Sequence, residues 1–128
     1  MAAKFGGRSG KLDITIEKGQ TFRLSAVYKV KSTGAPIDNS GWNVVMQIRA
    51  RKSDTGVPLL ELLSTNLTPD PRIELGGANG SLDLVIEDET TALITWKTAF
   101  YDVVYETATN EKFRLLEGKV TVSDGVTE

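Results

Sequence analysis

AFYDVVYETATNEKFRLLEGKVTV, the stretch from Ala99 to Val122, reads as a long β-hairpin. In its first arm apolar and polar residues alternate, which places three large side chains on one face: Tyr101, Val103 and Tyr105. A polar segment from Thr107 to Lys112 separates this arm from an apolar return arm. Alternation with period two indicates a strand that buries one face. The remaining chain must therefore supply the strands that cover this hairpin.

The return arm loses its alternation at Leu115 and Leu116, two adjacent apolar residues. One extra residue in a strand shifts the phase in this way and produces a β-bulge. Gly118 follows closely, and a glycine inside a strand is typical of a bent strand or a close backbone approach. The sequence therefore predicts a bulge at this point of the return arm.

The composition excludes several classes of site. The 128 residues, a natural length for one domain, contain neither cysteine nor histidine. Disulfide frameworks, thiolate metal sites and histidine-dependent triads are therefore excluded. The net charge of −2, with both signs interspersed, gives no electrostatic footprint for nucleic acid. We expect no cofactor and no metal, and no nucleophile stands beside a recognisable base, so we do not expect an enzyme.

The first ten residues, Met1 to Gly10, form a small, glycine-rich and basic arm that precedes the patterned chain from residue 11 to residue 128. The arm has no apolar core of a signal peptide, and no apolar run approaches a membrane span, so we expect synthesis in a cytoplasm. We predict that the arm lies across a neighbouring subunit. Phe5 would be its apolar anchor, and Lys4 and Arg8 would pair with acidic groups or carbonyls.

Further period-two segments predict an all-β fold of about seven or eight strands, as in a sandwich or small barrel. They cover residues 12–17, 21–30, 42–51, 59–63, 73–75 and 81–86. Asn79-Gly80 predicts a hairpin turn in which both residues take positive φ. Asp88 is expected to cap a single helical turn that crosses over to the hairpin.

The apolar side chains on one face of these segments are expected to form the core. The expected core residues are Trp42, Met46, Ile48, Leu84, Ile86, Tyr101, Val103 and Val120. Tyr101 follows the helical crossover, where a tyrosine often bonds back to the crossover backbone, the tyrosine corner.

Three other polar clusters in the sequence favour a structural role over a metal-binding or phosphate-binding site. Glu87 to Glu89 lack the alternating oxygen ligands of a hard-cation site and fit a helix start. Asp38 and Asn39 could bind calcium between loops, although they fit an Asx turn better. The loop from Gly76 to Gly80 lacks the ending of a phosphate-binding loop.

The ordered segments resemble a group of small tailed-phage virion proteins. The resemblance covers about residues 11 to 127 and rests on "KGQTFRLSAVYKV", "GAPIDNSGWNVVMQIRA", "LLELLSTN", "RIELGGANGSLDLVIEDETTALITW", "FYDVVYE" and "RLLEGKVTVSDGVT". It extends more loosely to the immunoglobulin-like domain of phage baseplate upper proteins. The family's fold residues are matched here by Trp42, Tyr101, Gly118 and Val120.

The resemblance implies an immunoglobulin-like antiparallel β-sandwich in a virion, at the head, neck, tail or baseplate. We therefore expect a structural protein that docks on other virion proteins and forms homo-oligomers, with no nucleic-acid or membrane partner. The alternative is a carbohydrate-binding module for host recognition. That role needs exposed aromatic side chains, for which the candidates are Trp96, Phe100 and Tyr105.

Overall fold

The computed structural model describes residues 2–3, 10–27, 29–30, 33–51, 56–65 and 70–124, with backbone alone for 2–3 and 29–30. Its elements are β1 (Ala2–Ala3), β2 (Gly10–Lys11), β3 (Ile14–Glu17), β4 (Phe22–Val27), β5 (Lys29–Val30), β6 (Asn43–Arg49), β7 (Leu60–Leu63), β8 (Arg72–Leu75), the 3₁₀ turn η1 (Gly77–Asn79), β9 (Ser81–Ile86), α1 (Asp88–Ala92), β10 (Thr98–Glu106) and β11 (Lys112–Ser123). The arm residues Lys4, Phe5 and Arg8 lie outside the described residues.

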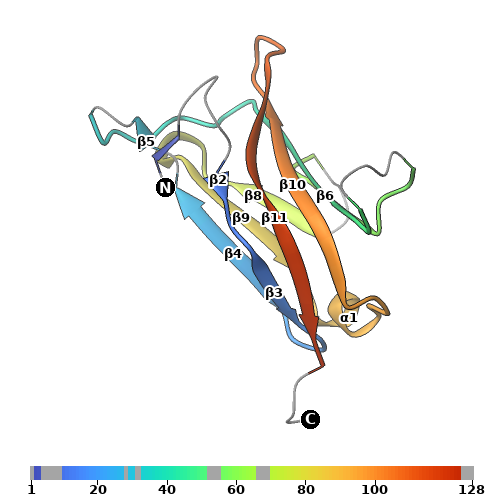
Figure 1. Ribbon diagram of the computed structural model, residues 1–128. Helices are drawn as coiled ribbons and strands as arrows, with labels where there is room; N and C mark the ends of the chain where they lie inside the picture. Colours follow the sequence, from blue (N-terminus) through green and yellow to red (C-terminus); the bar gives the residue numbers. More distant parts are fainter. Residues whose placement is uncertain are drawn as a thin grey trace.

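Two sheets form a sandwich, which confirms the all-β prediction. The larger sheet has the order β2-β11-β10-β6-β7, with β3 also paired to β11, and the smaller sheet has the order β4-β9-β8. Figure 1 shows the smaller sheet lying behind the long ribbons of β10 and β11. A separate two-stranded pair joins β1 to β5. The only α-helix among the described residues is the single turn of α1, which carries the chain from β9 to β10.

The hairpin from residue 99 to residue 122 is confirmed as β10 and β11. Val103 pairs with Leu116 and Val104 pairs with Arg114, so Leu115 is the extra residue of the predicted bulge. Because of this extra residue, both Leu115 and Leu116 are buried. The bulge thus lets two adjacent leucines enter the core from one strand.

All eight residues expected in the core are buried in one cluster between the sheets. The odd positions of β10 and the even positions of β6 face this core, as the alternation predicted. Met46, Ile48, Leu84, Ile86, Val103 and Val120 are fully inaccessible to solvent, and Trp42 and Tyr101 retain 8% and 4% exposure. Burial of this apolar surface is the main favourable contribution to folding.

The N-terminal strand departs from the expected antiparallel arrangement, because β2 and β3 both run parallel to β11. The ladder continues through Leu12, whose N–H donates to the Glu117 carbonyl over 3.0 Å, and the Lys119 N–H donates to the Asp13 carboxylate over 3.0 Å. Leu12 is 43% exposed, whereas Ile14 and Ile16, which follow it at alternate positions, are buried. The turn after Glu17 then leads from this edge of the larger sheet to β4 of the smaller sheet.

The Tyr101 hydroxyl bonds back to the backbone, although not to the crossover as predicted. It donates to the carbonyl of Leu12 in the N-terminal strand. Gly118 lies opposite Tyr101 in the ladder, and a Cβ there would lie 2.1 Å from the Leu12 oxygen. The absence of a side chain at residue 118 therefore creates the space in which Leu12 meets Tyr101.

The crossover is held by other polar contacts. The Thr91 hydroxyl, which is fully buried, donates to the Gln20 carbonyl over 2.8 Å and accepts from the Gly19 N–H over 3.1 Å. The predicted cap at Asp88 is wrong, because the N-cap is Glu87 and its N–H donates to the Asp70 carboxylate over 2.8 Å. The Asp70 carboxylate thus satisfies the backbone N–H of the N-cap residue, and the Glu87 side chain makes no capping hydrogen bond.

The β8–β9 hairpin is present, but its turn differs from the predicted two-residue turn. A 3₁₀ turn fills the loop, and Gly80 takes positive φ while Asn79 does not. Asn39 explains the longer loop. It is fully buried, its side-chain oxygen accepts from the Gly77 N–H over 2.8 Å, and its amide donates to the Ser81 carbonyl over 2.8 Å. Asn39 therefore fixes the segment before β6 to this loop.

Candidate interaction surfaces

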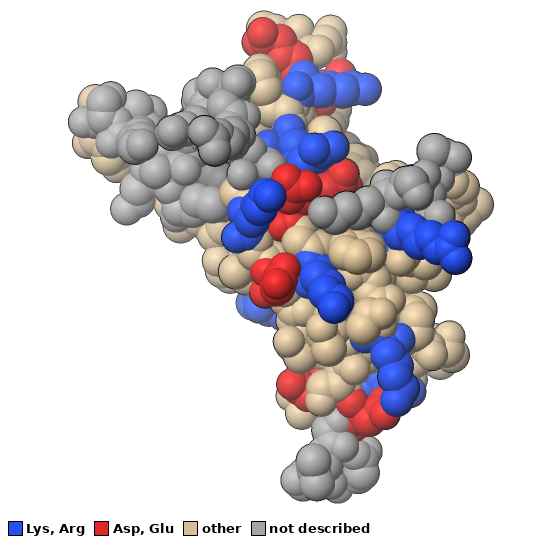
Figure 2. Space-filling model, viewed as in Figure 1, with Lys and Arg blue, Asp and Glu red and all other residues tan. Residues whose placement is uncertain are grey.

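The first surface is the outer face of the larger sheet, formed by the side chains of β6, β7, β10 and β11 that point away from the core. The register aligns them in rows across the strands. One row contains Arg114, Val104, Val45 and Leu63; the next contains Glu117, Asp102, Gln47 and Glu61; the third contains Lys119, Phe100 and Arg49. In Figure 2 basic and acidic side chains intersperse along this side of the molecule.

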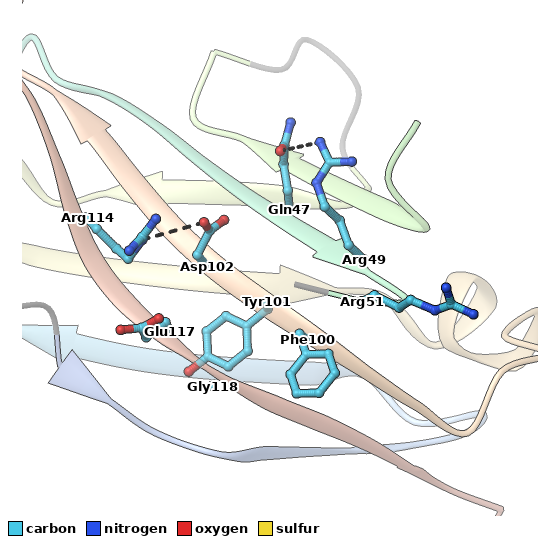
Figure 3. Close-up of a pocket in the computed structure, with 9 residues that line it drawn as sticks. All are labelled: Gln47, Arg49, Arg51, Phe100, Tyr101, Asp102, Arg114, Glu117 and Gly118. Atoms are coloured by element: carbon cyan, nitrogen blue, oxygen red, sulfur yellow. Dashed lines mark hydrogen bonds and ion pairs between the residues drawn. The ribbon is translucent and has the colours of Figure 1, made fainter. Parts of the chain in front are cut away.

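A hollow of about 190 Å³ lies on the outer face, where β6, β10 and β11 run side by side. Figure 3 shows Phe100 at the hollow, with arginines of β6 and of the loop that follows it on one side and residues of β11 on the other. The basic residues that line the hollow are Arg49, Arg51 and Arg114. The half-buried Phe100 gives this charged surface an apolar centre.

Polar contacts tie the rows of the outer face together. Arg114 pairs with the Asp102 carboxylate over 3.6 Å, and Arg49 donates to the Gln47 side-chain oxygen over 2.8 Å. The Gln47 amide in turn donates to Glu61 over 2.7 Å. Exposed pairs of this kind add about 0–1 kcal/mol to stability, so the charges can exchange partners with an approaching protein at little cost.

Tyr101 forms the floor of the hollow beside Gly118. Burial and the negative charges of Asp13 and Glu117 raise the pKa of Tyr101 to about 12. The phenol therefore stays protonated and keeps its hydrogen bond to Leu12 at neutral pH. This tyrosine acts as a structural link between the hairpin and the N-terminal strand.

The second surface is a pocket at the tip of the β10–β11 hairpin, which projects beyond the other strands in Figure 1. This tip pocket has a volume of about 580 Å³ and is lined by Ile37, Asp38, Trp42, Thr107, Thr109, Glu111 and Phe113. Sequence reasoning missed it, because its residues come from two segments far apart in the chain. From the sequence, Trp42 was assigned to the core, and Asp38 was assigned to an Asx turn in preference to a calcium site.

An aromatic stack supports the wall of the tip pocket. Trp42 stacks on Tyr105 with 4.2 Å between the ring centroids, and Tyr105 contacts Phe113 with 5.4 Å between theirs. Trp42 and Tyr105 are buried and Phe113 is half-buried. Tyr105 therefore cannot be an exposed platform for a sugar, and the other two candidates for that role, Trp96 and Phe100, are half-buried.

Two carboxylates stand at the tip pocket. The predicted Asx turn is present: Asp38 accepts from the Ser40 N–H over 2.8 Å, and hydrogen bonds from Ser40 lower the pKa of Asp38. Glu111 accepts from the Thr109 hydroxyl over 3.3 Å. None of the ion pairs among the described residues involves Asp38 or Glu111.

The last features of the described part of the chain concern metal ions and membranes. No three acidic side chains there come together in a group that could hold a metal ion. No helix there is long and apolar enough to cross a membrane.

Comparison with known proteins gives no relative: no protein-family model matches the chain, and no curated protein matches it. Its own residues and its two surfaces, the outer face and the tip pocket, therefore carry the functional proposal.

Proposed function

We propose that this chain is a structural component of a tailed-phage virion, an immunoglobulin-like sandwich that docks on other virion proteins and on copies of itself. The resemblance of its ordered segments to small phage virion proteins supports the virion role. The strand order supports the immunoglobulin-like type. β4, β9 and β8 take the places of strands B, E and D, and β11, β10 and β6 take the places of G, F and C.

The observation that carries the docking role is the outer face. Half-buried apolar side chains, namely Phe100, Val104, Val45 and Leu63, lie in its rows among charged ones. Non-obligate protein–protein interfaces mix apolar and polar surface in this way and are enriched in arginine, and Arg49 and Arg114 both lie in these rows. Phe100 is the aromatic residue of this face, and aromatic residues are enriched at such interfaces.

The N-terminal arm is the second part of the proposal. Ala2 and Ala3 pair with Lys29 and Val30 of the same chain, and Gly10 pairs with Leu116. Ala2, Ala3 and Gly10 therefore pair within their own chain, and the part of the arm proposed to reach a neighbour narrows to residues 4–9. Lys4, Phe5 and Arg8 remain its proposed partner-binding residues.

Electron microscopy of purified particles labelled with an antibody against this chain tests the virion role. We expect label at one fixed position on each particle, because a structural component occupies a defined place. A lysate that contains the chain, together with particles that carry no label, would rule the role out. A glycan array tests the carbohydrate alternative, and binding to a defined glycan would favour that alternative over docking.

A further inference from the structure

The tip pocket combines features that suit one kind of ligand. Two carboxylates, Asp38 and Glu111, stand at an apolar wall that includes Ile37 and Phe113. Its volume of about 580 Å³ falls within the usual range of about 300–1,000 Å³ for ligand pockets. A peptide that carries a cationic side chain beside an apolar one would match both the charges and the wall.

The tip pocket is preformed, because hydrogen bonds within the chain hold both of its sides. On the hairpin side, the Thr107 N–H donates to the Glu111 carbonyl over 2.9 Å and the Glu111 N–H donates to the Thr107 hydroxyl over 3.2 Å. On the other side, the Asx turn orients Asp38, and the buried Asn39 fixes the same loop to the β8–β9 hairpin. A preformed site loses less conformational entropy when it binds.

The chain itself contains a segment of the required chemistry. Residues 1–11, MAAKFGGRSGK, contain two lysines, one arginine and one phenylalanine, and no acidic residue. Phe5 lies next to Lys4 and three residues before Arg8, so one short peptide can present an apolar group between two cations. The sign of its charge is opposite to that of the pocket.

We propose that the tip pocket receives the segment from Lys4 to Arg8 of a second copy of this chain. Phe5 lies against the apolar wall, and Lys4 and Arg8 face Asp38 and Glu111. This proposal rests on the proposed self-association and identifies the site that performs it. Pocket and segment lie on the same chain, so two copies can exchange their segments about a two-fold axis, and a contact that does not close in this way builds a ring or a filament.

Fluorescence anisotropy of a labelled peptide with the sequence of residues 1–11, titrated with the full-length protein, tests the pocket directly. We expect saturable binding that weakens with salt, because the charges are exposed. Replacing both carboxylates, Asp38→Asn with Glu111→Gln, should weaken binding about tenfold, since each exposed ion pair accounts for a factor of about three. Asparagine keeps the Asx turn, so the loop should keep its shape.

The matched control replaces two exposed acids on the crossover, Asp88→Asn with Glu89→Gln, which changes the net charge equally. We expect the affinity to stay within about twofold of wild type. If both pairs of substitutions weaken binding equally, the peptide is attracted by net charge alone and the pocket is not its binding site. A Phe5→Ala peptide that binds as tightly as the original would overturn the apolar contact.

Charge reversal tests the second copy. One double variant, Asp38→Lys with Glu111→Lys, makes the pocket basic, and the other, Lys4→Glu with Arg8→Glu, makes the segment acidic. In sedimentation neither variant should self-associate, because its pocket and segment carry the same sign of charge. An equal mixture of the two should form complexes of one-to-one stoichiometry. If the wild-type chain stays monomeric at all concentrations, the segment that binds the pocket does not come from a second copy.

The pocket and the virion role fail under different results. If the peptide does not bind but purified particles contain the chain, the pocket proposal is wrong and the virion role is retained. If the peptide binds but particles lack the chain, the virion role is wrong and the pocket proposal is retained.

Discussion

Gly118→Ala should release the N-terminal strand from β11. A Cβ at residue 118 would lie 2.1 Å from the Leu12 oxygen, 2.7 Å from the Leu12 carbonyl carbon and 3.1 Å from a ring carbon of Tyr101. The two closest atoms are backbone atoms, which a rotamer change cannot move. Leu12 must therefore shift outward, away from the hairpin.

The shift would break three hydrogen bonds: from the Tyr101 hydroxyl to Leu12, from the Leu12 N–H to Glu117, and from the Lys119 N–H to Asp13. Each contributes about 0.5–1.5 kcal/mol to stability. Replacing a glycine in a strand opposes this loss by about 0.5–1 kcal/mol. We therefore expect a net loss of about 0.5–4 kcal/mol in the free energy of unfolding.

Urea unfolding followed by circular dichroism measures this loss. Gly56→Ala is the matched control, because nothing lies within 4 Å of a Cβ there, and we expect a change below about 0.5 kcal/mol. Tyr101→Phe adds a second check. It should cost about 1 kcal/mol in the wild type and almost nothing in Gly118→Ala, where the hydrogen bond is already lost. A Gly118→Ala variant as stable as the control, or additive costs, would refute the reasoning.

Three further outcomes follow from the same structure. Ile48→Ala should lower the free energy of unfolding by about 2–5 kcal/mol, since the side chain is fully buried, whereas Val57→Ala, at a residue 96% exposed, should change it by less than about 0.5 kcal/mol in the same urea titration. The folded pKa of Tyr101, about 12, lies above the ordinary value of 10, so its contribution to stability is complete below pH 10 and is lost as the pH rises toward 12. Stability measured from pH 9 to pH 12 should therefore fall more steeply for the wild type than for Tyr101→Phe, and parallel curves would contradict this. Deletion of residues 1–9, which keeps Gly10 on β11, should leave the melting temperature of the sandwich unchanged but reduce its self-association, and normal association of the truncated chain would exclude a binding role for the arm.

The hairpin and the core were predictable because the pattern of β10 depends only on neighbours in the sequence. Tyr101, Val103 and Tyr105 alternate with polar residues, so their common face follows from the period of a strand. The bulge was predictable for the same reason, since Leu115 and Leu116 break that period.

Contacts between distant segments could not be read from such a pattern. The meeting of Leu12 with Tyr101 depends on the parallel pairing of the N-terminal strand, which no local signal specifies. Asn39 looked like an ordinary turn residue, because only the folded chain brings Gly77 and Ser81 to its side chain. The tip pocket was missed for the same reason, since its two carboxylates, Asp38 and Glu111, come from segments far apart in the sequence.

If the outer face docks this chain into a virion, a substitution on that face should change the protein content of purified particles. Particles from phage that encode wild type, Phe100→Asp or Leu93→Asp would be purified through a density gradient and analysed by quantitative mass spectrometry. Leu93 is 78% exposed on the crossover and serves as the control. We predict wild-type amounts of the chain with Leu93→Asp and a strong loss with Phe100→Asp, although both variants fold. Equal incorporation of the two variants would contradict the docking face, and absence of the wild-type chain from particles would contradict the virion role itself.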